Sequence, residues 1–334
     1  MKKCYSLVLL LIIILNSGCT DWKDEVTDAR KGKYFGLAEP GNSPVVFASG
    51  LISTNLSERD VTFSPDGKEI YYTLWTGSFG VIVVLREGED SWSEPEVLSF
   101  SKKYSNIEPF INKDGSKLFF SSTRLKKKNG EEKDYDIWYV ERIDSSWGEP
   151  VNLGVPINTD ANEFYPSVAE NGNIYFTAAY DNSIGGEDIW MCELSNGKYL
   201  PPQNLGEAVN DKTDDFNAFI SPDESYIIFS SWGRDDSFGS GDLYISFKNK
   251  NNEWLPAINL GDRINSPALD FCPYVTRDQK YFFFTSRRRS GDLNNKIFRE
   301  YDSLTTLLNS TQNGHNDIYW MNSNFIDSLR KTEY

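Results

Sequence analysis

One short pattern returns five times along the chain of 334 residues, and it constrains the fold more than any other feature. Each copy places a short apolar run before a turn such as Asp-Gly or Asn-Gly, and an aromatic, β-branched run after it. This arrangement predicts a tight β-hairpin. The copies occupy residues 63–73, 111–122, 168–178, 220–231 and 275–286.

The last two copies lack the turn glycine. Asp223-Glu224 and Asp278-Gln279 stand where the other copies have Asp-Gly or Asn-Gly. Glycine reaches positive φ without a steric penalty, whereas other residues reach it only at a cost. These two turns must therefore avoid a positive φ or place it on a more tolerant residue.

Each repeat contains four predicted strands. The first leads into the turn and the second follows it. The third begins at Asp-Ile-Trp or a variant, and the fourth carries Trp-x-x-Pro or part of that motif. Repeats of about fifty residues with four strands each predict an all-β fold, a β-propeller of four-stranded antiparallel blades. We count five blades, and six is the alternative if one blade is degenerate. The recurring third-strand aspartates are Asp136, Asp188, Asp242 and Asp317.

The fifth repeat lacks a fourth strand, because the chain runs from its third strand into a short tail. An isolated strand pattern at residues 44–47 has no partner of its own. We expect this N-terminal strand to complete the last blade, which closes the ring and removes the open sheet edges. Residues 44–334 then form a single domain.

The turn sequence Ser64-Pro65-Asp66-Gly67 and the Asp-Ile-Trp elements at 136–138 and 188–190 resemble those of the TolB-like, WD-like β-propeller repeat family of bacterial envelope proteins. The resemblance covers about residues 44 to 320 and implies an envelope location. It does not imply one function, because this fold carries binding platforms, protease accessory domains and some enzymes.

The N-terminus carries an export pattern. Lys2 and Lys3 precede an apolar run at 7–15, which is too short to span a bilayer as a mature helix. Asn16-Ser17-Gly18-Cys19 then resembles the end of a bacterial lipoprotein leader, which implies removal of residues 1–18, lipidation of Cys19 and a membrane anchor. We expect residues 19–43 to be a tether. Within it, residues 23–25 resemble the acidic tag of outer-surface lipoproteins, so we expect an outer-membrane lipoprotein facing the periplasm or the cell surface.

The net charge argues against two kinds of partner, and the cysteine positions argue against a disulfide. The formal net charge is −15, which disfavours nucleic acid and anionic membrane surfaces as partners. Once Cys4 and Cys19 are set aside, Cys192 and Cys272 remain, and they fall in repeats that are not neighbours. We expect no disulfide between them and interpret both as small buried apolar residues.

An acidic residue near the start of each first strand is the main candidate for a binding site. Five such acids at the mouth of the central channel could hold a cation or contact a sugar or an amine. Alternatively, each acid accepts backbone N–H groups at its own blade junction, and recurrence in every blade favours this structural role. The five acids are Glu58, Glu108, Glu163, Asp215 and Asp270.

Two tryptophans and two basic runs lie in the loops after second strands. We expect Trp75 and Trp232 to lie on the face of the propeller where the channel mouth and these loops open, and they are candidates for stacking on a ligand. The runs 126–128 and 287–289 are solvated loops or sites for an anionic glycan or a partner.

Catalysis has little support in the sequence. His315 is the only histidine and no Gly-x-Ser-x-Gly element occurs, so we expect no catalytic residue, no metal site and no cofactor. Our leading hypothesis is a non-catalytic, lipid-anchored platform that binds an envelope protein or a glycan. The alternative is a glycoside hydrolase or lyase that uses channel carboxylates. A third is an accessory domain whose catalytic partner is a separate protein.

Overall fold

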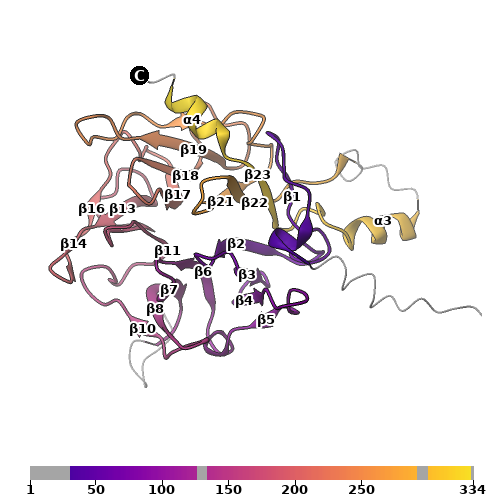
Figure 1. Cartoon of the computed structure of the whole chain (residues 1–334). Coiled ribbons are helices and arrows are strands. Elements are labelled where there is room, and N and C mark those ends of the chain that lie inside the picture. Colours follow the sequence, from indigo (N-terminus) through magenta and orange to yellow (C-terminus); the bar gives the residue numbers. More distant parts are fainter. Residues whose placement is uncertain (1–30, 126–133, 292–299, 332–334) are drawn as a thin grey trace, which may run out of the picture.

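The computed structural model describes residues 31–125, 134–291 and 300–331. These residues form five sheets with four main strands each, arranged around a central axis (Figure 1). The protein is therefore a five-bladed β-propeller, as the repeats predict, and the described ranges contain no sixth blade. Residues 1–18, the lipidation site Cys19, the tether up to residue 30 and the basic run 126–128 lie outside the described residues.

Within each of the first four blades, consecutive strands pair in antiparallel order from the channel outward. Blade 1 contains β2 (Glu58–Phe63), β3 (Glu69–Trp75), β4 (Gly80–Arg86) and β5 (Glu96–Val97). Blade 2 contains β6 (Asn106–Ile111), β7 (Lys117–Ser122), β8 (Asp136–Ile143) and β10 (Val151–Asn152), with β9 (Ser146–Trp147) paired to β8. Blade 3 contains β11 (Glu163–Val168), β12 (Ile174–Ala178), β13 (Asp188–Cys192) and β16 (Gln203–Asn204). Blade 4 contains β17 (Asp214–Ile220), β18 (Tyr226–Trp232), β19 (Asp242–Phe247) and β20 (Ile258–Asn259).

Blade 5 joins the two ends of the propeller. It contains β21 (Asp270–Val275), β22 (Tyr281–Ser286), β23 (Asp317–Asn322) and, as its outermost strand, β1 (Val45–Val46). Val45 pairs with Trp320 and Val46 with Tyr319 in antiparallel register. The predicted closure of the last blade by an N-terminal strand is confirmed.

The remaining elements are short. They are η1 (Lys33–Gly36), η2 (Ser99–Ser101), the small hairpin of β14 (Leu194–Ser195) and β15 (Lys198–Tyr199), α3 (Tyr301–Leu308) and α4 (Asn324–Arg330). Helix α3 projects from the edge of the propeller (Figure 1). None of the helices in the described ranges has the length and apolar character needed to cross a bilayer.

The described part of the expected tether packs on the propeller. Tyr34 and Phe35 are buried, and the ring of Phe35 lies 4.9 Å from that of Trp92. The indole of Trp92 donates a hydrogen bond of 2.9 Å to the carbonyl of Gly32. Packed structure thus begins near Gly32 and not at residue 44, because two aromatic side chains in this segment find a place in the core.

All five hairpin turns contain a residue with positive φ. Gly67 and Gly115 have φ of 74°. Glu224 and Gln279 adopt 57° and 54° at the equivalent places. Of the two outcomes left open by the sequence, the turn conformation is kept and the non-glycine residue carries the strain.

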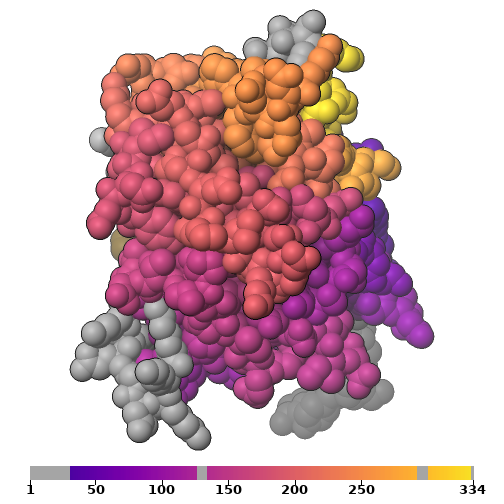
Figure 2. Space-filling view, turned by 90° about the vertical axis from the view of Figure 1, so that its left-hand side faces the viewer, coloured from indigo at the N-terminus to yellow at the C-terminus, as the bar shows by residue number. Residues whose placement is uncertain are grey.

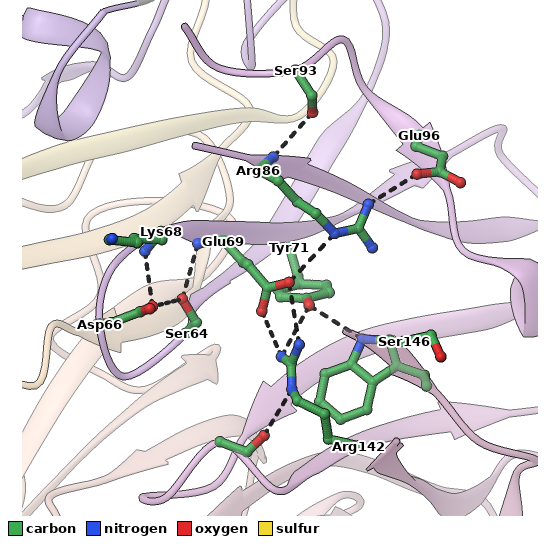
Figure 3. Close-up of polar contacts among 12 residues, drawn as sticks. Ser64, Asp66, Lys68, Glu69, Tyr71, Arg86, Ser93, Glu96, Arg142 and Ser146 are labelled. Carbon is green, nitrogen blue, oxygen red and sulfur yellow. Dashed lines mark hydrogen bonds and ion pairs between the residues drawn. The ribbon is translucent and has the colours of Figure 1, made fainter. Parts of the chain in front are cut away.

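Adjacent blades are also tied together by polar contacts near these turns. Between blades 1 and 2, Glu69 accepts hydrogen bonds from Arg142 and lies 3.4 Å from Arg86 (Figure 3). The guanidinium of Arg142 stacks 4.1 Å above the ring of Trp147, whose indole N–H donates to Tyr71 of blade 1 at 3.1 Å. At the outer edge of the propeller, consecutive blades form one continuous surface (Figure 2).

A recurring asparagine network secures the third strands. In blades 3 and 4, the carboxylates of Asp188 and Asp242 accept local backbone N–H groups. They also accept side-chain amides of Asn204 and Asn259. In blade 1, Val81 stands at the place of this aspartate, because it pairs with Leu74, the partner of Glu58.

Candidate functional site at the mouth of the channel

Three consecutive positions of each first strand line the channel, and we name them the junction, wall and floor positions. The junction residues pair with the end of the second strand and are Glu58, Asn106, Glu163, Asp215 and Asp270. The wall residues come next and are Arg59, Ile107, Phe164, Phe216 and Phe271. The floor residues follow and are Asp60, Glu108, Tyr165, Asn217 and Cys272.

Four of the five predicted acids occupy the junction position, where they are 0–1% exposed. Each of these four accepts the backbone N–H of the residue four places earlier, for example Thr159 to Glu163 at 3.1 Å and Ser266 to Asp270 at 2.6 Å. Asp270 also pairs with Arg288 at 3.0 Å. These contacts are those of a blade junction, and burial keeps all four carboxylates from a ligand, including Oε2 of Glu163, which has no hydrogen-bond partner among the described residues.

Glu108 was grouped with the other acids, and the register corrects this. Asn106, which pairs with Ser122, holds the junction position of blade 2, and Glu108 lies two residues further at the floor. The two positions are hard to separate by sequence because Asn106 is not acidic, which makes Glu108 the first acid of this strand. Glu108 is therefore not equivalent to the other four acids.

The floor residues form a β-bulge in every blade. All five have positive φ, between 50° and 62°. The bulge turns their N–H groups toward the preceding blade, where Thr73 accepts from Glu108 at 3.1 Å and Thr177 accepts from Asn217 at 3.0 Å. This backbone geometry aims the five floor side chains at one another across the channel.

A hydrogen-bonded network of these side chains closes the channel around Arg59. Glu108 accepts from Arg59 at 2.9 Å, from the N–H of Tyr165 at 2.7 Å and from Asn217 at 3.3 Å. Asp60 accepts from Arg59 at 2.7 Å and from the thiol of Cys272. Burial raises the pKa of Glu108 to about 7, and the charge of Arg59 opposes this rise.

The two remaining cysteines have different surroundings. Both Cys192 and Cys272 are buried and unbridged, as the sequence predicts. Cys272, however, is not in an apolar environment, because its sulfur contacts Asp60, Asn217 and Arg59. Burial raises the pKa of the Cys272 thiol well above its usual value, so it serves as a hydrogen-bond donor.

A cavity of about 510 Å³ opens above this floor, and we name it the mouth pocket. All five wall residues line it: Arg59, Ile107, Phe164, Phe216 and Phe271. Sequence reasoning missed these residues. The available signal was that an aromatic residue follows the junction acid in three of the five blades.

Trp75 and Trp232 both lie at the rim of the mouth pocket, and Trp232 is 56% exposed. Each tryptophan also lines a flanking cavity. Trp75 borders one of about 550 Å³ over blades 1 and 5, and Trp232 borders one of about 850 Å³ over blades 4 and 5. Large apolar side chains that remain exposed beside a hollow are typical of ligand-binding surfaces.

Three charged residues complete the rim, and only one of them belongs to a pattern noted in the sequence. Asp214 accepts the N–H of Glu187 at 3.0 Å, while the carboxylate of Glu187 has no hydrogen bond to any described residue. Burial, with the nearby charge of Asp214, raises the pKa of Glu187. On the opposite side Arg287, from the basic run, donates from Nε to Asn316 at 2.9 Å. Glu187 and Asp214 were missed because each directly precedes a recurring aspartate.

No metal site is formed in the part of the chain that the structure describes, where no three His, Cys, Asp or Glu side chains are grouped around a common point. The mouth pocket therefore combines an aromatic wall, a closed polar floor and a rim with separated charges.

The fold and this pocket define a class, that of five-bladed propellers with a ligand-sized hollow at one end of the channel. No protein-family model matches the chain, and no curated protein sequence matches it. Among solved structures, a glycoside hydrolase matches with a TM-score of 0.50 and 9% identity, over 90% of this chain and 93% of its own. An α-L-arabinofuranosidase from Lactobacillus brevis matches with a TM-score of 0.48 and 12% identity, over 82% and 95%.

TolB from Acinetobacter baumannii also matches, with a TM-score of 0.44 and 13% identity. That match covers 79% of this chain, which spans about half (54%) of the TolB chain. At these identities the matches bear on the fold alone.

Proposed function

We propose that this protein is a non-catalytic, lipid-anchored β-propeller of the bacterial envelope that binds a glycan in its mouth pocket. One observation carries the proposal. All five wall residues line the mouth pocket, and four of the five are aromatic or aliphatic, whereas only Glu108 and Asn217 of the floor residues reach it. Sugars present apolar C–H faces that stack on such side chains.

Binding without catalysis is supported by the state of the channel acids. A hydrolytic pair needs two carboxylates free to reach the substrate. The four junction acids are occupied by backbone N–H groups, and Asp60 and Glu108 share the guanidinium of Arg59. These six acids have structural partners that a substrate would have to displace.

Titration with glycans tests the binding proposal. Intrinsic tryptophan fluorescence of the full chain is followed against a panel of envelope and dietary oligosaccharides. We expect a saturable change with at least one of them and a loss of affinity of about fivefold or more in Trp232→Ala. Tyr301→Ala is the matched control, because Tyr301 is 79% exposed on α3 and lines none of the cavities. If no glycan binds and an envelope protein is instead cross-linked at the mouth pocket, the platform recognises protein.

The membrane anchor is proposed from the leader and is supported by the position of η1. Lys33 lies 3.6 Å from Asp278, so the N-terminal segment packs at the hairpin-turn end of the propeller, away from the mouth pocket. A lipid on Cys19 would then hold the turn end near the membrane and leave the pocket accessible. We expect Cys19→Ala to move the protein from the outer-membrane fraction to the soluble fraction. Protease treatment of intact cells separates the periplasmic from the surface-exposed orientation.

The second candidate is a glycoside hydrolase or lyase. It is favoured by Glu187, whose carboxylate is unbonded among the described residues and whose pKa is raised, and by the pKa of Glu108, near 7. A pKa near 7, as at Glu108, suits a proton donor at neutral pH. Release of new reducing ends or unsaturated products from a bound glycan, abolished in Glu187→Gln, would replace the binding proposal with this one.

A further inference from the structure

The mouth pocket and its two flanking cavities meet at one residue. Arg287 lines all three, while Trp75 is shared by the mouth pocket and the 550 Å³ cavity, and Trp232 by the mouth pocket and the 850 Å³ cavity. The hollow is therefore a continuous groove with an aromatic side chain at each boundary. A groove of this kind is longer than one sugar ring and suits an oligosaccharide.

The 850 Å³ cavity is basic, although the chain is acidic. Arg287, Arg288 and Arg289 all line it, and none of its lining residues is Asp or Glu. Arg288 is neutralised by Asp270. In a protein with a net charge of −15, a hollow lined by three arginines and by no acidic residue is suited to an anionic ligand.

Arg287 is the arginine that is free to bind such a group. Its Nε is held by Asn316, which in turn donates to Ser57 at 2.8 Å. It makes no ion pair with any described residue. The guanidinium is thus oriented by one edge while its two terminal nitrogens remain available, the geometry in which arginine binds a planar carboxylate with two parallel hydrogen bonds.

The opposite rim offers complementary chemistry. The carboxylate of Glu187 is partly buried in the mouth pocket and has no hydrogen-bond donor among the described residues. Carboxylates in sugar sites accept hydrogen bonds from ring hydroxyl groups. Glu187, Arg287 and the aromatic wall line the same cavity, and the guanidinium of Arg287 lies 5.9 Å from the ring of Phe271.

We infer that the ligand is an acidic oligosaccharide that contains uronate units. A uronate carboxylate binds Arg287, hydroxyl groups of the chain donate to Glu187, and the sugar faces stack on Trp75 and Trp232. This inference rests on the proposed function, because it names the class of glycan that the same site takes.

Calorimetric titration of the full chain with two matched probes tests this inference. The probes are an α-1,4-linked tetragalacturonate and its fully methyl-esterified form, which keeps the sugar chain and removes the charges. We expect the acid form to bind at least tenfold more tightly at low ionic strength, with a preference that shrinks as salt is added. Arg287→Gln should abolish the preference without weakening the ester, and Arg287→Lys should retain only part of it.

Arg263→Gln is the control, since Arg263 is an exposed arginine that lines none of the three cavities. Thermal melting of each variant verifies that it is folded. Equal binding of both probes, or an equal loss of both in Arg287→Gln, overturns the inference and leaves glycan binding intact. If neither probe binds while a neutral oligosaccharide does, the inference also fails alone. If no glycan binds at all, the proposed function fails with it.

Discussion

The junction and floor positions of the first strands lie two residues apart, yet they differ in nearly every property. Four of the five junction residues are acids with the same backbone partner, four places earlier in the chain. The five floor residues share a positive φ, but no two of them are the same amino acid. The junction residues repeat together with their partner, so they stabilise each blade in the same way. The floor residues repeat only in backbone conformation, and their different side chains meet at one place in the channel.

This difference separates scaffold from site. Changes at repeated positions should cost stability, whereas changes at the wall and rim should cost binding.

The largest effect is expected at the junction of blade 5. Asp270→Ala leaves the N–H of Ser266 and the half-buried Arg288 without their acceptor, and we expect a loss of about 3 kcal/mol in the free energy of unfolding. Urea denaturation measures it. Asp270→Asn should cost only about 1 kcal/mol, because Asn106 already fills this position in blade 2. If the alanine variant is as stable as the wild type, the junction acids do not stabilise the fold.

The turn of blade 4 comes second. The carboxylate of Glu224 accepts hydrogen bonds from Asn171, Asn173 and the hydroxyl of Tyr175, all in blade 3. Glu224→Gly relieves a positive φ but removes these ties, so we expect a net loss of about 1–2 kcal/mol. Urea denaturation of Glu224→Gly is compared with that of Tyr175→Phe, which removes only one of the three hydrogen bonds. The comparison separates the relief of backbone strain from the loss of hydrogen bonds. A gain in stability would mean that backbone strain outweighs the contacts.

The third prediction concerns pH. Burial raises the pKa of Glu163 and of Asp317 to about 7, above the value of about 4.5 or less expected in the unfolded chain. Between these values the folded state binds more protons, so stability should fall as pH rises from about 4.5 to 7, by on the order of 1 kcal/mol for each group. Glu163→Gln should flatten this fall in a series of melting curves. An unchanged slope would mean that Glu163 is ionised throughout this range in the folded protein.

The smallest effect is a gain. Gln279 has φ of 54°, is exposed and has no side-chain hydrogen bond among the described residues. Gln279→Gly should therefore stabilise the protein by about 0.5 kcal/mol, since only the strain is removed. The opposite signs expected at Glu224 and Gln279 can be compared in the same denaturation series. A loss in Gln279→Gly would show that the entropy of the unfolded glycine chain dominates.

The repeats alone were sufficient for the architecture. The turn sequences, the third-strand aspartates and the missing fourth strand predicted five blades and their closure, because each reports a local conformation that recurs. The functional site was harder to predict from the sequence. Glu108 was grouped with the junction acids because blade 2 has Asn106 at the junction and Glu108 is the first acid of its strand.

The wall residues also could not be predicted from the sequence. Phe164, Phe216 and Phe271 resemble ordinary strand residues in the sequence, and only the tilt of five first strands toward one axis brings them to one pocket. The packing of Tyr34 and Phe35 was also not predicted, since their neighbours in the sequence are polar or glycine. Contacts between distant segments decide both cases.

The closure of blade 5 has a mechanical consequence. Two residue pairs join β1 to β23, and backbone hydrogen bonds from Asn322 to Gly41 and from Phe47 to Ile318 flank them. Because the strands are antiparallel, the start of β1 lies toward the C-terminal end of β23. A force that pulls the two chain ends apart would load these pairs one after the other, from the same end, as a zipper is opened. The ring would then open at blade 5 before any other blade is stretched, while the aromatic contacts of Tyr34 with Tyr281 and Trp320 resist its first step.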